Sequence, residues 1–216
     1  MITTPDLINS LAANATPVRR LRPPLARAAL WMLVAVVVLV LLAVSQGIRM
    51  DLLQRVQDPI FVIGMAATLL TGILATISAF MVSLPDRSPF WAALPVPAFI
   101  VWLSTIGYQC LTNWVSLRPE GLSPGETARC FATLVLTSLP LLLVLGLMLR
   151  HAASLRPMAT ALTGGLAVAA MTATALSLFH ELDATVMILA WNLGTAALFV
   201  GLGALLGPRM LSWAAR

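Results

Sequence analysis

Long apolar runs alternate with short polar clusters along the whole sequence. Six of the runs reach the length of about 20 residues that an α-helix needs to cross the hydrocarbon of a bilayer. They cover residues 28–48, 59–84, 90–109, 131–149, 158–179 and 184–206, and none of them contains an Asp, Glu, Lys or Arg. The pattern predicts an all-α membrane protein: a polar segment over residues 1–27, followed by a six-helix transmembrane bundle over residues 28–216.

Composition strengthens this interpretation. The 216 residues are 60% hydrophobic and 10% charged, with a mean hydropathy of +0.96, whereas soluble proteins average about 25% charged residues. So few polar side chains cannot cover a water-facing surface, which excludes a soluble globular enzyme. The sequence also has no P-loop, HExxH zinc motif, GxSxG elbow or dinucleotide-binding glycine motif. We therefore expect neither an enzyme nor a bound cofactor.

The basic residues, all of them arginines, indicate the orientation. In the six-span topology nine lie on the side of the N-terminus, namely Arg19, Arg20, Arg22, Arg27, Arg87, Arg150, Arg156, Arg209 and Arg216. Four lie on the other side, namely Arg49, Arg55, Arg118 and Arg129. Because basic residues are enriched in cytoplasmic loops, we expect both termini in the cytoplasm.

A short amphipathic helix is predicted near the N-terminus. Thr4 is its expected N-cap, the helix begins at Pro5, and Asp6 lies in the positive first turn. Its apolar face carries Leu7, Ile8 and Leu11. Such a helix is too short to be stable alone in water, so it either docks on another surface or frays.

A basic, proline-containing stretch follows, with Arg19, Arg20 and Arg22 leading to the first span. Two interpretations of residues 1–27 stay open. One is a topology signal that touches anionic lipid, and the other is an amphipathic anchor that folds onto a cytoplasmic partner.

Two cysteines lie at the predicted outer ends of consecutive spans, Cys110 at the end of the third and Cys130 at the start of the fourth. If these spans pack as neighbours, about 8–10 Å apart, a disulfide would close a loop of about 20 residues and contribute about 3 kcal/mol. Three interpretations remain: a constitutive staple or ordinary packing, a reversible thiol sensor, and a metal site shared with His180 in the short turn after the fifth span.

Small residues recur every four positions in the fifth span, at Ala161, Gly165, Ala169, Ala173 and Ser177. Such a face lets a neighbouring helix approach closely, which predicts a packing seam, either within the bundle or at a homodimer interface. Pro95 and Pro97 in the third span and Pro140 in the fourth are expected to kink those helices.

Four segments, in chain order, read DLINSLAANATPVRRLRPPLARAALW, GYQCLTNWVSLRPEGLSPGETARCF, LPLLLVLGLMLRHAASLRP and FHELDATVMILAWNLG. They resemble the NrsF-like anti-sigma factors, the negative regulators of sigma F. The resemblance extends over nearly the whole chain. It implies a six-span, multi-pass protein of the inner membrane of a Gram-negative bacterium.

The same resemblance implies that the chain sequesters a cytoplasmic extracytoplasmic-function (ECF) sigma factor and releases it on oxidative or metal stress, with a metal ion as a transient signal. The resemblance implies contact with a sigma factor and with lipid, but no direct contact with nucleic acid. Sensing in the family is associated with two cysteines. Cys130 matches one of them, whereas the other position falls near His180, where this chain has no cysteine, and Cys110 is its expected substitute.

Two other classes of protein compete with the anti-sigma interpretation. A small transporter or channel for a neutral solute would need polar groups that line a path across the membrane, and Asn192 with scattered Ser and Thr makes a thin lining. A membrane-embedded redox enzyme would need a closely spaced cysteine pair, which the sequence does not offer. The anti-sigma interpretation ranks first and the transporter second.

Overall fold

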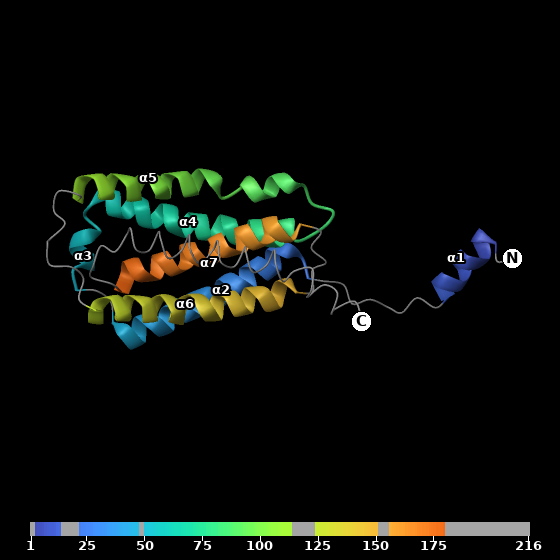
Figure 1. The fold of residues 1–216 in the computed structure, drawn as a ribbon, viewed down its shortest axis with the longest axis horizontal. Helices are drawn as coiled ribbons and strands as arrows, with labels where there is room; N and C mark the ends of the chain where they lie inside the picture. Colours follow the sequence, from blue (N-terminus) through green and yellow to red (C-terminus); the bar gives the residue numbers. More distant parts are fainter. Residues whose placement is uncertain (1–2, 14–21, 48–49, 114–123, 151–155, 180–216) are drawn as a thin grey trace.

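The computed structural model describes residues 3–13, 22–47, 50–113, 124–150 and 156–179. This part of the chain is all-helical, with seven α-helices, one 3₁₀ helix and no strand (Figure 1). The elements are α1 (Thr4–Ala13), α2 (Pro24–Gln46), α3 (Leu52–Arg55), α4 (Pro59–Val82), η1 (Pro89–Ala93), α5 (Val96–Asn113), α6 (Pro124–Leu149) and α7 (Pro157–Phe179). The predicted all-α class is confirmed.

Four helical segments are long and apolar enough to cross a membrane, which indicates membrane association. They are Pro24–Ser45, Pro59–Val82, Pro89–Tyr108 and Pro157–Leu178. The apolar part of α6 is shorter, Val135–Leu149, and the expected span over residues 184–206 lies outside the described residues. The count of six spans and the cytoplasmic termini therefore stay predictions.

Prolines mark where the apolar helices begin, because proline lacks the N–H that would be unpaired there and its fixed φ already suits a helix. Pro24, Pro59, Pro89 and Pro157 each open a helix. The Asp58 side chain accepts a hydrogen bond from the backbone N–H of Ile60, at 2.9 Å.

The expected break in the third span appears as the change from η1 to α5. Pro140 lies inside α6.

Helices α4 and α7 form the centre of the bundle, and they pack against each other more extensively than any other pair. Helix α5 packs on α4, whereas α2 and α6 lie on the other side of the central pair (Figure 1). In the most apolar stretch of α7, 67% of the residues are buried, whereas only 22% are buried in the most apolar stretch of α2. Helix α7 is therefore a core helix and α2 a peripheral one.

Small residues let α7 sit at the centre. A Cβ added to Gly164 would lie 3.0 Å from Cδ2 of Leu145 in α6, and one added to Gly72 in α4 would lie 3.4 Å from Met171. Of the expected small-residue face, Ala173 is buried, whereas Gly165 and its other members are only partly buried. The close contacts of α7 are therefore not confined to the expected small-residue face.

The expectation that the third and fourth spans pack as neighbours is wrong. Helix α5 packs mainly on α4, helix α6 packs on α7 and α2, and Figure 1 shows α5 and α6 on opposite sides of the bundle. The physical reason is that two helices, α4 and α7, fill the space between them. Chain order alone does not fix which helices become neighbours.

Candidate functional site

Helix α1 is capped one residue earlier than expected, which corrects the choice of Thr4. The Thr3 carbonyl accepts a hydrogen bond from the N–H of Leu7 at 3.0 Å, so Thr3 is the cap. The Thr3 backbone N–H donates to the Asp6 carboxylate at 3.3 Å, and the Asp6 backbone N–H donates to the Thr3 hydroxyl oxygen at 3.4 Å. This reciprocal pairing, three residues apart, has the pattern of a capping box.

The apolar side chains of α1 are open to a partner. Leu7 is 48% exposed and Ile8 is 60% exposed, and α1 stands apart from the bundle in Figure 1. Leu11 belongs to the same helix, but its side chain is outside the described part, as are Arg19 and Arg20. Arg22 is exposed and lies two residues before α2.

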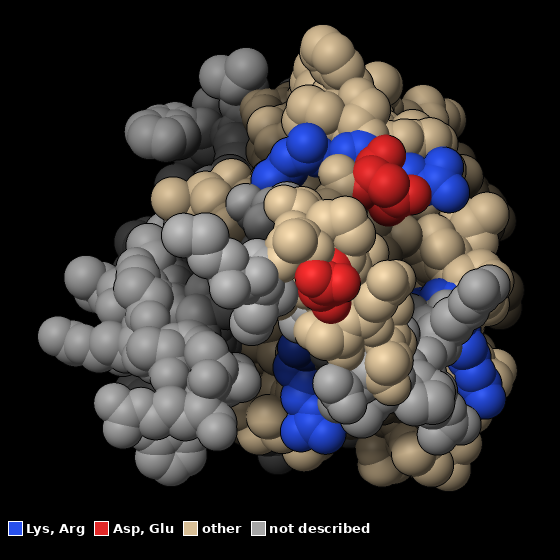
Figure 2. Space-filling model, turned by 90° about the vertical axis from the view of Figure 1, so that its right-hand side faces the viewer, with Lys and Arg blue, Asp and Glu red and all other residues tan. Residues whose placement is uncertain are grey.

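One end of the bundle, which we call the arginine end, collects the basic side chains. It comprises the start of α2, the end of α4, η1, the end of α6 and the start of α7. Its described arginines are Arg22, Arg27, Arg87, Arg150 and Arg156, and Asp86 is the one acidic residue of the described bundle there. Figure 2, which views this end, shows arginines around its rim.

The opposite end of the described bundle has the reverse balance. It carries three acidic residues, Asp51, Asp58 and Glu126, and two arginines, Arg55 and Arg129. Because opposite charges attract over about 8–10 Å at moderate salt, the arginine end is the one suited to an acidic partner or to anionic lipid headgroups.

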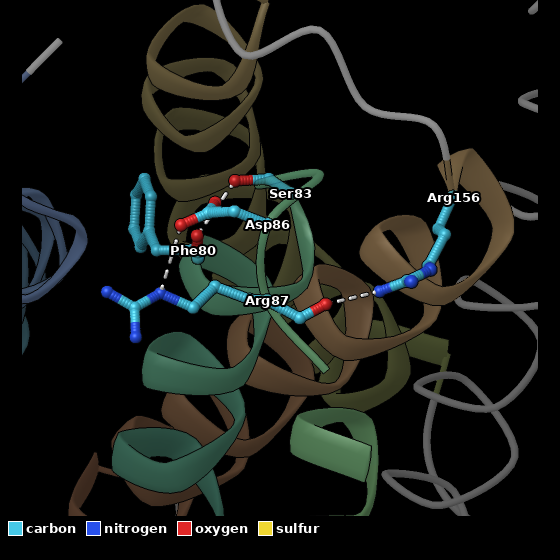
Figure 3. Close-up of polar contacts among 5 residues, drawn as sticks. All are labelled: Phe80, Ser83, Asp86, Arg87 and Arg156. Atoms are coloured by element: carbon cyan, nitrogen blue, oxygen red, sulfur yellow. Dashed lines mark hydrogen bonds and ion pairs between the residues drawn. The ribbon is translucent and has the colours of Figure 1, made fainter. Parts of the chain in front are cut away.

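Hydrogen bonds from side chains to backbone carbonyls hold the arginine end together. Arg156 at the start of α7 donates to the Arg87 carbonyl at 2.7 Å, and the Arg87 side chain extends away from Arg156 (Figure 3). Ser78 in α4 donates to the Trp91 carbonyl of η1 at 2.7 Å. The ion pair between Arg87 Nε and Asp86 Oδ2, 3.7 Å apart, is exposed and adds little stability.

Arg27 is the residue of this end that sequence reasoning missed. It was counted as a charge before the first span, but α2 begins at Pro24 and takes Arg27 into its first turn, so the expectation that the spans contain no charged residue is wrong for this helix. Its side chain is only 6% exposed. The Pro23-Pro24 pair was the available signal, since proline favours the first helical position.

Two groups contact the Arg27 guanidinium. Nη2 donates to the Met148 carbonyl in the last turn of α6, and the guanidinium carbon lies 5.0 Å from the centroid of the buried Phe80 ring in the last turn of α4. Nη1 is buried and makes no hydrogen bond. The negative C-terminal end of α6 and the face of an aromatic ring from α4 thus hold this cation.

The cysteines lie at the opposite end of the bundle. Cys110 is in the last turn of α5 and Cys130 is near the start of α6, on helices that do not pack as neighbours. His180 lies outside the described residues. Within the residues that the structure describes, no three His, Cys, Asp or Glu gather as metal ligands.

The fold and these two ends define a helical protein with membrane-length spans, a basic end and an exposed amphipathic helix. The chain belongs to the NrsF family, described as negative regulator of sigma F, whose family model matches residues 11–213. The family name implies an anti-sigma factor with a sigma factor as its partner, and a regulator rather than an enzyme. Searches of curated proteins and of solved structures gave no match.

Proposed function

We propose that this chain is a multi-pass anti-sigma factor of the bacterial inner membrane, which holds an ECF sigma factor at its cytoplasmic face and releases it on oxidative or metal stress. The family match over residues 11–213 carries the regulatory role. The observation that supports membrane sequestration is the exposed apolar face of α1, in a chain whose bundle has spans of membrane length.

The arginine end is the proposed cytoplasmic face. Five described arginines lie there, Arg22, Arg27, Arg87, Arg150 and Arg156, against Arg55 and Arg129 at the described opposite end. Positive charge is enriched on the cytoplasmic side of membrane proteins. This orientation puts α1 in the compartment where a sigma factor is found.

The N-terminal segment is the proposed primary contact. Leu7, Ile8 and Leu11 would enter an apolar groove of the sigma factor, with Arg19, Arg20 and Arg22 facing its acidic side chains. Coupled folding of a short segment costs about 2–5 kcal/mol. We therefore assign a share of the contact to Arg87, Arg150 and Arg156 on the arginine end.

Sensing is proposed at the opposite end, through Cys110 and Cys130, with His180 as a further candidate. The two cysteines lie on helices at different sides of the central pair, so the proposal does not rely on a shared α5–α6 contact. Cys130 has the more direct route inward, because α6 runs from it to the arginine end as one helix.

Co-purification tests the proposed function. The full chain, solubilised from membranes in mild detergent, should retain a sigma factor, and peroxide or cadmium treatment of the cells should lower the retained amount. A chain that brings no sigma factor would refute sequestration.

The transporter alternative gains no support from the core. Buried Thr68, Thr71 and Thr76 in α4 each donate to a carbonyl one turn earlier in their own helix, all at 2.7 Å. Their hydroxyls are therefore already satisfied and do not offer a polar path to a solute.

A further inference from the structure

We infer that Arg27 is a positioning residue that couples α6 to the N-terminal segment. Its guanidinium fixes the first turn of α2 against the last turn of α6, and so fixes where the sigma-binding segment leaves the bundle. The inference deepens the proposed function and rests on it for the identity of the partner.

The Arg27 contact lies where it can position the N-terminal segment. Arg27 lies five residues after Arg22 and in the first turn of α2, so any movement of that turn moves the attachment point of the N-terminal segment. Its acceptor is the carbonyl of Met148, one residue before the end of α6. The tie between α2 and α6 continues deeper, where buried Trp31 donates its Nε1–H to the Leu141 carbonyl at 3.1 Å.

Helix α6 connects this contact to the opposite end of the bundle. Cys130 and Met148 belong to the same helix and are separated by about 27 Å along its axis at about 1.5 Å per residue. A tilt or rotation of α6 that begins near Cys130 therefore changes the position of the Met148 carbonyl. Pro140, between the two, is the place where the helix bends most easily.

The Arg27 contact is suited to two states rather than to one. In the state that the structure shows, which we call the caged state, the cation contacts one carbonyl and one ring face, and Nη1 makes no hydrogen bond with any described residue. A buried charge with incomplete partners is costly. A long arginine side chain near a helix end can instead extend to the lipid headgroups, so loss of the Met148 carbonyl would release the guanidinium outward. We assign the caged state to sequestration, because it fixes the point at which the N-terminal segment joins α2.

A distance measurement tests the positioning role without any partner. Spin labels are placed at Arg22→Cys and Arg150→Cys, two exposed positions, in the full chain with Cys110→Ser and Cys130→Ser, reconstituted in lipid nanodiscs. The distance distribution should be narrow with Arg27, broad with Arg27→Gln, and narrow again with Arg27→Lys, which keeps a donor for the Met148 carbonyl.

A second variant protects the test against simple misfolding. Phe80→Leu keeps an apolar side chain but removes the ring face, so it should broaden the same distribution to a smaller extent. Unchanged distributions in both Arg27→Gln and Phe80→Leu would overturn the inference.

Sigma-factor retention tests the functional consequence in the chain with native cysteines. Arg27→Gln should lower the retained sigma factor by about tenfold, equivalent to the loss of one charge-assisted hydrogen bond. Because Arg27 is buried, the loss should be the same at low and high salt, whereas the smaller loss in Arg22→Gln should change with salt. Arg55→Gln, at the opposite end, is the matched control for charge and should retain sigma factor normally.

The outcomes separate this inference from the proposed function. If the wild-type chain retains no sigma factor, the proposed function fails, and the distance measurement alone decides whether Arg27 positions the segment. If wild type retains sigma factor and Arg27→Gln retains it equally, the inference is overturned while the proposed function stands.

Discussion

Replacing Leu7 with Asp should free the sigma factor, and the exposure of α1 allows the effect to be estimated. Burying a whole Leu or Ile side chain contributes about 1.5–3 kcal/mol. Leu7 is 48% exposed and Ile8 is 60% exposed, so docking would bury about half of each side chain, worth about 1 kcal/mol per residue. These two residues therefore contribute about 2 kcal/mol to the apolar contact.

The Leu7→Asp variant loses its share of that contact and also brings a polar group into an apolar groove, which costs about 1–3 kcal/mol in proteins for a neutral group and more for an ionised one. The total of about 2–4 kcal/mol corresponds to a loss of about 30-fold or more in affinity. A reporter gene controlled by the sigma factor should become active without stress. Immunoblots of the membrane fraction should show normal amounts of the protein, because Leu7 lies outside the membrane-length spans.

Asn9→Asp is the matched control for this prediction. Asn9 belongs to the same helix and is exposed, but it lies on the face away from Leu7 and Ile8 at about 100° per residue. It introduces the same charge at nearly the same size. If Asn9→Asp activates the reporter as strongly as Leu7→Asp, the charge and not the apolar face is responsible. If Leu7→Asp leaves the reporter silent, the docking hypothesis is wrong.

Three further predictions follow from the bundle. Compartment reporters fused after the C-terminus and within residues 118–126 should report opposite sides of the membrane, and identical sides would contradict the six-span topology. Cys130→Ser should abolish release under peroxide stress and Cys110→Ser should weaken it, with unstressed retention unchanged; a normal response in the double variant would leave the cysteines a packing role. Gly164→Leu should destabilise the purified protein by about 1–3 kcal/mol in thermal unfolding, because Leu145 already lies 3.0 Å from a Cβ at that position, whereas Gly164→Ala should cost much less.

The helices themselves could be predicted from sequence because each requires only local information. Apolar runs of sufficient length, begun by proline, locate α4 to the residue at its start, and α7 to within one residue. The cap of α1 was misplaced because Thr3 and Thr4 are both good cap residues. Only Thr3 has Asp6 at the spacing of a reciprocal pair.

Neither the neighbours of α6 nor the burial of Arg27 could be obtained in this way. Hydropathy treats an arginine as the boundary of a span, since an isolated cation in hydrocarbon is costly. Arg27 is an exception because the ends of α4 and α6 converge on it and supply Phe80 and the Met148 carbonyl. Which helix ends converge depends on the packing of the whole bundle, and a single sequence contains no direct record of it.

The packing also limits how a signal could cross this bundle. The buried hydroxyls of α4 and α7 are mostly bonded to their own helices, as with Thr71 and Thr174, so they do not form a polar chain between the two ends. Helix α5 reaches the N-terminal segment only through the central pair, whereas α6 touches α2 directly. A change at Cys130 therefore has a shorter mechanical route to α1 than a change at Cys110, passing through the body of α6 to Arg27. Because of this asymmetry we expect a larger loss of the stress response in Cys130→Ser than in Cys110→Ser. Equal losses would instead indicate that α5 and α6 transmit the signal together through α4 and α7.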